Sequence, residues 1–251
     1  MFMPLHVLAY DCWAPGAAGP ESWLAWRRGG TAPTGNEPPA LKQIKPMQRR
    51  RLSLQARAAY EVAGRCLEHL QESEREGLQS VFASAHGQCA ATLKMLETLA
   101  RSEQLSPAAF SISVHNAIAG QFSISHQLTG ASTSLSPGRD GLGGVFLEAL
   151  GQLAQGAAHT LVCCLEEPVP GELAPYEENP PTALAAAFLL ARDPTPGTRT
   201  VQMSRGVGTG APPLPFWAQA AEFVCFLQAG TGQLNLDGGP TAYRWGSDVG
   251  G

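Results

Sequence analysis

Apolar residues along the chain recur with two different periods, one typical of helices and one typical of buried strands. In residues 51–70 they return every three or four positions, which predicts an amphipathic helix. In residues 159–167, HTLVCCLEE, they form a nearly continuous run, which predicts a strand covered on both faces of a sheet. Strand-like and helix-like segments alternate along the chain. We therefore expect an α/β fold, a mixed β-sheet flanked by helices in α-β-α layers.

The same two periods place the remaining elements. Further strands are predicted at residues 5–10, 80–84, 131–136, 183–192 and 242–246. Further helices are predicted at residues 21–29, 87–103, 107–128, 142–155 and 216–228. No internal repeat and no interdomain linker is visible, so residues 1–251 are expected to form a single domain.

Two of these segments carry more detailed expectations. Helix 87–103 is predicted to turn its apolar residues inward, namely Leu93, Leu96, Leu99 and Ala100. Residues 193–215 are rich in Pro, Gly and Thr and are predicted to form a loop.

Composition narrows the class of protein. A net charge of −4 argues against general nucleic-acid binding, because no broad positive field faces the phosphates. No apolar run reaches the roughly 18 residues that span a bilayer, and the first residues lack the pattern of a signal peptide. The six cysteines form no CxxC pair, which indicates reduced, buried thiols in a cytoplasmic protein without a metal site. No cofactor motif is found, so no cofactor is expected.

The stretch SLSPGRDGLGG at residues 134–144 has the pattern of a strand, a tight turn and a helix. Many α/β enzymes hold a nucleophile at such a turn, where the positive end of the helix dipole favours an anion. Here the turn consists of Ser136, Pro137, Gly138, Arg139 and Asp140, and none of them is a cysteine.

Several stretches together resemble the N-terminal domain of β-ketoacyl synthases, which have the thiolase-like fold. They are WAPG at 13–16, ESWLAWRRG at 21–29, PMQRRRLS at 46–53, VFASAHGQCAATLKMLETLA at 81–100 and LSPAAFSISVHNAIAGQFSI at 105–124. The resemblance covers nearly the whole chain and implies a thiolase-like half-fold. It is nearest to the short subunits, similar to chain length factors, of aryl polyene-type fatty acid and polyketide biosynthesis.

The resemblance implies that catalysis is lost. It places the catalytic cysteine of active relatives near Gly138, and glycine cannot form the acyl thioester. Active relatives also take two histidines (or a His and an Asn) and a lysine from a second half, whereas no histidine follows His159 here. We therefore expect no independent enzymatic activity, with no catalytic residue in this chain.

The resemblance also implies a partner. Ketosynthase-like proteins pair through the strand before this turn, here Ala131, Ser132, Thr133, Ser134, Leu135 and Ser136, which would otherwise be an unprotected edge. We expect a heterodimer with a catalytic β-ketoacyl synthase, in which this subunit shapes the acyl tunnel. Candidate residues for the tunnel wall are Phe110, His115, Asn116, Phe122 and Phe146. Arg49, Arg50 and Arg51 are candidates for contact with an acidic acyl carrier protein.

Two alternatives remain open from the residues. His86 and Cys89 are three positions apart and could form the dyad of a minimal acyltransferase. The chain could also be a carrier-protein-binding scaffold without a ketosynthase partner. For His115 and Asn116 the residues themselves favour backbone capping or packing over catalysis, and the resemblance keeps a pocket role open.

Overall fold

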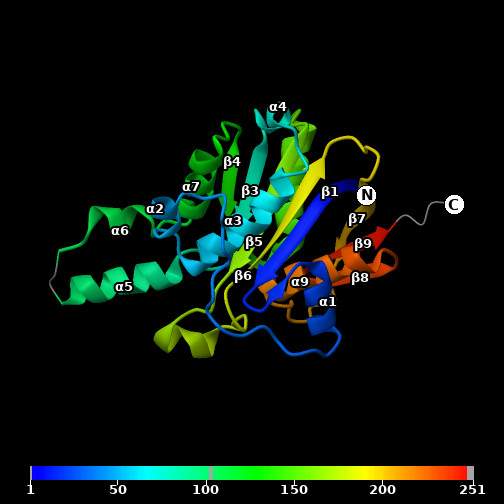
Figure 1. The fold of residues 1–251 in the computed structure, drawn as a ribbon. Helices are drawn as coiled ribbons and strands as arrows, with labels where there is room; N and C mark the ends of the chain where they lie inside the picture. The colour runs from blue at the N-terminus through cyan, green and yellow to red at the C-terminus, as the bar shows by residue number, and fades with distance from the viewer. Residues whose placement is uncertain (1, 102–103, 248–251) are drawn as a thin grey trace.

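In a computed structural model, which describes residues 2–101 and 104–247, the chain forms a nine-stranded mixed sheet with helices on both faces (Figure 1). The strands are β1 (Phe2–Ala14), β2 (Ala17–Ala18), β3 (Gln79–Ala83), β4 (Ser132–Leu135), β5 (His159–Glu166), β6 (Leu184–Ala191), β7 (Arg199–Val207), β8 (Gln233–Asp237) and β9 (Thr241–Ser247). The helices are α1 (Pro20–Arg27), α2 (Pro46–Arg49), α3 (Leu54–Leu67), α4 (Glu72–Arg75), α5 (Cys89–Ala100), α6 (Pro107–Ser111), α7 (Ala117–His126), α8 (Gly141–Ala154) and α9 (Phe216–Ala229), with 3-10 turns η1 (Gly138–Asp140) and η2 (Gly171–Tyr176).

The strands lie in the order β4-β3-β5-β6-β1-β7-β9-β8, with β2 beside β1. Strands β4, β3 and β5 are parallel, and every other pair is antiparallel. Their central members, β5 and β6, are buried almost throughout, as expected for strands covered on both faces. The mixed sheet and the α-β-α layering confirm the predicted fold class.

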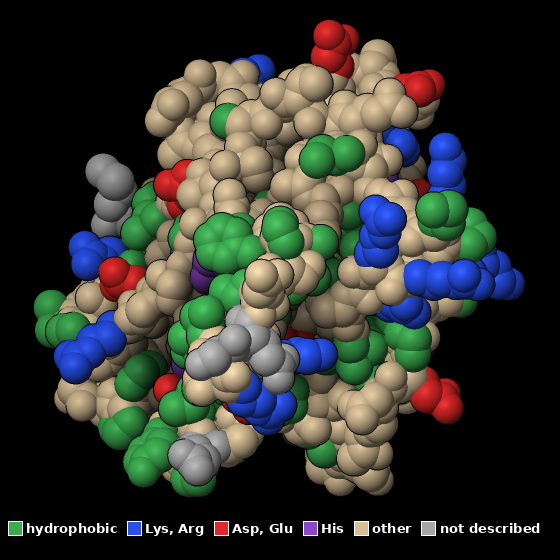
Figure 2. All heavy atoms as spheres, turned by 90° about the vertical axis from the view of Figure 1, so that its left-hand side faces the viewer, with side chains coloured by type: hydrophobic (Ala, Val, Ile, Leu, Met, Phe, Trp, Pro, Cys, Tyr) green, Lys and Arg blue, Asp and Glu red, His purple; other side chains and the backbone are tan. Residues whose placement is uncertain are grey.

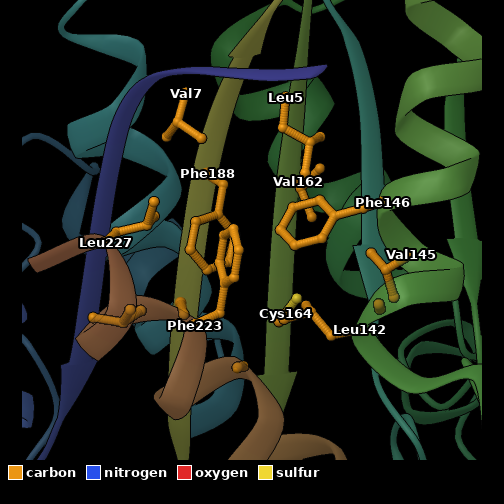
Figure 3. Packing of buried hydrophobic residues seen from close by; sticks show 14 of the residues in the cluster. Leu5, Val7, Leu142, Val145, Phe146, Val162, Cys164, Phe188, Phe223 and Leu227 are labelled. Atoms are coloured by element: carbon orange, nitrogen blue, oxygen red, sulfur yellow. The ribbon is translucent and has the colours of Figure 1, made fainter. Parts of the chain in front are cut away.

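Two apolar clusters lie on the two faces of the sheet. On one face α8 and α9 pack against β5 and β6, and Figure 3 shows Phe146 of α8 and Phe223 of α9 lying against Phe188 of β6. These rings are 4.8–5.6 Å apart between centroids, at the inclined angles that aromatic pairs favour. On the other face α3 and α7 pack through Tyr60 and Phe122. Helix α9 therefore completes a layer that α8 alone leaves open.

The loop predicted at residues 193–215 is wrong for Arg199–Val207, which form a strand. Strand β7 forms there and pairs with both β1 and β9. Val201 and Met203 are fully buried, so β7 alternates as a half-buried strand does. Strand β8 was also missed, and the predicted helix 107–128 is two helices, α6 and α7.

Helices α5 and α6 form an arm that projects from the body (Figure 1), and the inward orientation predicted for α5 is wrong. No residue of α5 is buried, and the side chains of Leu96 and Leu99 are more than half exposed. Phe110, Ile112 and Val114 on the returning segment are exposed as well. The helical spacing was read correctly, but the described part of the chain supplies no surface for this apolar face to pack on.

Candidate functional site

The strand–turn–helix at residues 132–154 is formed as the sequence predicts, by β4, η1 and α8. Gly138 lies on the exposed side of the turn with φ of +54°, a conformation that side-chain-bearing residues adopt at a cost. A Cβ added at Gly138 would have no atom within 4 Å. The position thus has room for a cysteine side chain and contains none.

A side chain of α9 is hydrogen-bonded to the first turn of α8. The backbone N–H of Leu142 donates to Gln219 Oε1 at 3.0 Å, and Gln219 Nε2 donates to the carbonyl of Leu214 at 2.7 Å. A Cβ on Gly141 would come within 2.2 Å of Gln219, and one on Gly143 within 2.2 Å of the Tyr243 ring. An N–H group that could stabilise an anion at this helix start is therefore already hydrogen-bonded.

The two charged residues of the turn do not bond to each other. The side chain of Asp140 makes no cap bond to α8 and instead accepts from the hydroxyl of Tyr243 at 3.2 Å. Arg139 is exposed, and within the described residues it forms no ion pair with Asp140. Pro137 is the buried member of the turn.

A hollow of about 430 Å³ lies over the turn and is bordered by carboxylates, including Glu166 and Glu177. Glu166 is 3% exposed and accepts a hydrogen bond from the N–H of Ala85. Burial first of all, with the neighbouring charges of Glu167 and Glu177, raises the pKa of Glu166 from 4.5 to about 8, although the hydrogen bonds from Ala85 and Ser84 act to lower it. Glu166 is therefore protonated near neutral pH, and the negative charge that disfavours anionic groups in this hollow comes from Glu177 and Glu178.

The base of the arm is fastened to the turn. Ser136 Oγ donates to the carbonyl of Ala85 at 3.0 Å, and Glu166 holds the N–H of the same residue. His115, where the arm returns, lies 3.0 Å from the carbonyl of Ser84 through Nε2. Gly87 has room for this ring only because it has no side chain, since a Cβ there would lie 2.6 Å from His115.

Strand β4 is an edge strand, as predicted: it pairs with β3 on one side and with no strand of the described chain on the other. Beside it, His115 and Asn116 face Ser132 and Ser134 across a hollow of about 400 Å³. Figure 2 faces the side of the molecule that carries the arm, and it shows hydrophobic side chains over this face, with Lys and Arg most numerous at the right and others at the left and lower centre.

The three phenylalanines predicted for a pocket are not brought together. Phe122 and Phe146 are fully buried in the two clusters on opposite faces of the sheet. Phe110 is 59% exposed on α6. Of the predicted set, the structure joins His115 and Asn116 alone in one hollow.

The basic segment at Arg49, Arg50 and Arg51 divides into two roles. Arg49 Nη1 donates to the carbonyls of Ala40 and Leu41, at 2.8 and 3.4 Å, and so holds the preceding loop. Arg50 and Arg51 are exposed, and Arg51 borders a hollow of about 360 Å³ between α2 and α7.

The thiols are not arranged for nucleophilic chemistry. Burial raises the pKa of Cys89, and the charges of Glu167 and Glu177 raise it further, which disfavours the thiolate. His86 Nε2 lies 3.4 Å from Glu177 Oε2, and no hydrogen bond between His86 and Cys89 is formed. Within the described residues no cluster of His, Cys, Asp or Glu could hold a metal ion. Nor does that part contain a helix long and apolar enough to cross a membrane.

Sequence reasoning missed the polar residues that fasten this site. Gln219 and Gln152 interrupt the apolar faces of α9 and α8, and each is more than nine-tenths buried. A glutamine at a core position of a predicted helix is a signal for a buried hydrogen bond, although the sequence does not name its acceptor.

Comparison with known proteins agrees with this geometry. The β-ketoacyl synthase N-terminal domain model matches residues 23–246. The chain belongs to this family. No curated protein matches it.

Solved structures show the same fold for this ketosynthase-like chain. One is a ketosynthase (ApeO) in complex with its chain length factor (ApeC) from Xenorhabdus doucetiae, with a TM-score of 0.81 and 24% identity over 97% of this chain and 99% of that one. The ishigamide ketosynthase/chain length factor matches with a TM-score of 0.58 and 16% identity, over 82% of this chain and 68% of that one. A type II acyl carrier protein in complex with its ketosynthase (AntDE:AntF) matches with a TM-score of 0.59 and 14% identity, over 75% and 62%. At these identities the likeness is one of fold.

Proposed function

We propose that this protein is a non-catalytic ketosynthase-like subunit that pairs with a catalytic β-ketoacyl synthase in aryl polyene-type fatty acid or polyketide biosynthesis. The observation that carries the proposal is the uncovered side of the molecule. There β4 has an unpaired edge, and the arm with its exposed Leu96, Leu99 and Phe110 projects on the same side of the molecule (Figure 1), on a chain whose turn has no cysteine.

Two features support the lack of catalysis. Gly138 lies where the resemblance places the acyl-accepting cysteine. The N–H of Leu142, in the first turn of α8, is hydrogen-bonded to Gln219. The acidic hollow over the turn further disfavours an anionic substrate. The condensation chemistry would therefore belong to the partner.

Two features support pairing. An open edge strand exposes unpaired backbone groups, which proteins cover or protect. Exposed apolar side chains on a projecting arm lose this exposure when a partner surface covers them, at about 25 cal/mol for each Å² removed from water. The related structures of a ketosynthase with its chain length factor provide the geometry for such a pair.

In this pair the hollow of His115, Asn116, Ser132 and Ser134 would be roofed by the partner and would limit the acyl chain by its size. The limit on acyl chain length is thus proposed to lie in a polar hollow beside β4, and not at Phe110, Phe122 and Phe146.

For carrier-protein contact, Arg50 and Arg51 are the free members of the basic segment, and Arg49 is engaged with its own loop. The apolar hollow next to Arg51, which includes Met47 and Ile124, suits a partner that combines acidic and apolar residues.

The test is co-expression with a full-length catalytic ketosynthase from the same genome, followed by light scattering of the purified species. We expect a one-to-one complex that condenses acyl groups only when the ketosynthase keeps its own cysteine. A chain that purifies alone as a monomer, with no ketosynthase bound, would overturn the proposal. The matched carrier-contact control compares Arg50→Glu with Lys94→Glu, a charge reversal on the arm.

A further inference from the structure

The face of β4 that is turned toward α8 carries a small cluster of polar side chains. Thr133 Oγ1 donates to Glu148 Oε1 at 2.8 Å. Gln152 Nε2 donates to Thr133 Oγ1 at 3.2 Å, to Glu148 Oε1 at 3.3 Å and to the carbonyl of Ser80 at 3.5 Å. The hydroxyl and amide donors of the cluster are thus directed inward, onto its own members and β3.

The groups of this cluster that still lack a hydrogen-bond or ion-pair partner among the described residues are acceptors. Gln152 is 7% exposed, and within the described part of the chain its Oε1 atom has no hydrogen-bond partner. Glu148 is half-buried and forms no ion pair with any described residue. A buried acceptor without a donor costs about 1–3 kcal/mol, so this arrangement favours a donor from outside.

The backbone of β4 fixes how a second strand would pair with it. The carbonyls of Ala131 and Leu135 accept from Ser80 and Ser84 on the β3 side. Alternate residues of a strand direct their backbone groups to opposite sides, so those of Ser132 and Ser134 are directed outward.

A second copy of this chain pairs poorly at that edge. In an antiparallel pair, residues whose backbone groups point toward the shared edge lie opposite each other. When two copies of β4 overlap along their whole length, Ser132 of one copy therefore lies opposite Ser134 of the other. Thr133 then faces Thr133 of the second copy in the close, non-hydrogen-bonded type of pair, with Cα atoms about 4.5 Å apart. Each Thr133 holds a Glu148, so two carboxylates and two unpaired amide oxygens would meet around the two-fold axis. Like charges at such a position oppose association.

We propose that the Thr133–Glu148–Gln152 cluster selects a heterologous ketosynthase over a second copy by accepting an arginine or lysine side chain from the partner. This rests on the proposed pairing of β4. A guanidinium or ammonium group donates to both a carboxylate and an amide oxygen and accepts from neither. One such side chain would donate to the half-buried carboxylate of Glu148, which Thr133 and Gln152 hold in place beside β4.

The experiment uses the full chain, alone and with the co-expressed full-length ketosynthase, and compares Glu148→Gln and Glu148→Lys with the wild type. Glu21→Gln on α1, remote from β4, is the matched control for loss of one carboxylate. Light scattering gives the mass of the chain alone, and a titration gives the dissociation constant of the complex. Thermal unfolding of each free chain reports whether it folds.

We expect the wild-type chain alone to be a monomer and to bind the ketosynthase. Glu148→Lys is expected to weaken the complex at least about tenfold, because a cation then faces a cation. Glu148→Gln is expected to weaken it less and to allow self-association, whereas Glu21→Gln changes neither.

The two proposals fail in different ways. If the wild-type chain binds no ketosynthase, the proposed function is overturned. If the complex forms but Glu148→Lys binds within twofold of the wild type, or the wild-type chain alone is as tight a homodimer as the complex, the selection by this cluster is overturned and the pairing stands.

Discussion

Glu166, at the end of β5, shows how one side chain can connect the turn with the arm. Its carboxyl group is buried, holds the N–H of Ala85, and lies next to the hollow over the turn. Because burial disfavours the charged form, Glu166 keeps its proton to a higher pH in the folded chain than in the unfolded chain.

This linkage has a defined sign. Between the unfolded pKa of 4.5 and the folded value of about 8, the folded state binds the proton and the unfolded state does not. Stability is therefore expected to fall as pH rises through this window, by at most about 1.4 kcal/mol per pH unit. Glu166→Gln should remove this part of the slope in urea unfolding at pH 5.5 and 8, and exposed Glu72→Gln should not. Equal slopes for Glu166→Gln and the wild type would contradict the assignment.

The state of the turn can be tested by placing a thiol in it. Gly138→Cys is expected to cost about 1–2 kcal/mol because of the positive φ. Its thiol should alkylate more slowly than that of Gly197→Cys, an exposed glycine with positive φ and no atom near an added Cβ. A thiolate at position 138 would not be stabilised, because carboxylates border the hollow and the N–H of Leu142 at the start of α8 is already hydrogen-bonded.

The readout is mass-spectrometric alkylation of the native variants near neutral pH. Faster alkylation at position 138 than at position 197 would show that the turn still activates a nucleophile.

At the scale of elements, helix α5 of the arm and helix α9 differ in packing. Both have apolar residues at helical spacing, but only the apolar residues of α9 are buried against other elements. Helix α9 buries most of its residues against β6 and α8, whereas α5 buries none. The difference lies in the tertiary contacts of each helix, because both sequences repeat apolar residues at helical spacing.

Truncation of matched phenylalanines measures this difference. Phe223→Ala removes a ring that lies within 6 Å of four other aromatic rings and is expected to cost about 3–5 kcal/mol in urea unfolding. Phe110→Ala removes a ring that is 59% exposed and should cost within about 0.5 kcal/mol. A large loss for Phe110→Ala would mean that the arm packs on the body.

The arm has its own prediction. The double change Leu96→Glu and Leu99→Glu should leave the unfolding free energy of the isolated chain nearly unchanged, because both side chains are more than half exposed. It should weaken a ketosynthase complex at least about tenfold, since charged groups would be buried without partners. Val207→Glu, at the exposed end of β7, is the control in the same binding titration. Unchanged affinity of the double variant would exclude the arm from the interface.

At the scale of the whole molecule, the described residues build one continuous mixed sheet. Strand β7 extends the sheet from β1, β9 and β8 follow it, and α9 covers the face beside α8. The described sheet ends in two edge strands, β4 and β8, and the arm projects on the side of β4 (Figure 1). The edge of β4 with the neighbouring arm is the place where we expect a partner to add most.

Local patterns in the sequence determined much of this architecture. The buried strands β5 and β6, the amphipathic α3, the strand–turn–helix with Gly138 and the uncovered edge at 131–136 followed from period, composition and resemblance. The strands and helices depend on neighbours in the chain, and a local pattern contains that information, whereas the edge position of 131–136 came from the resemblance.

Tertiary structure alone decided the rest. Strand β7 forms within a Pro- and Gly-rich segment because β1 and β9 supply hydrogen-bond partners on both sides. Leu96 and Leu99 stay exposed because the described chain places nothing against them. The bond from Leu142 to Gln219 and the contact of Thr133 with Glu148 join residues far apart in sequence or on different elements. The helical or strand period of a segment reports which face is apolar, but packing decides what that face meets.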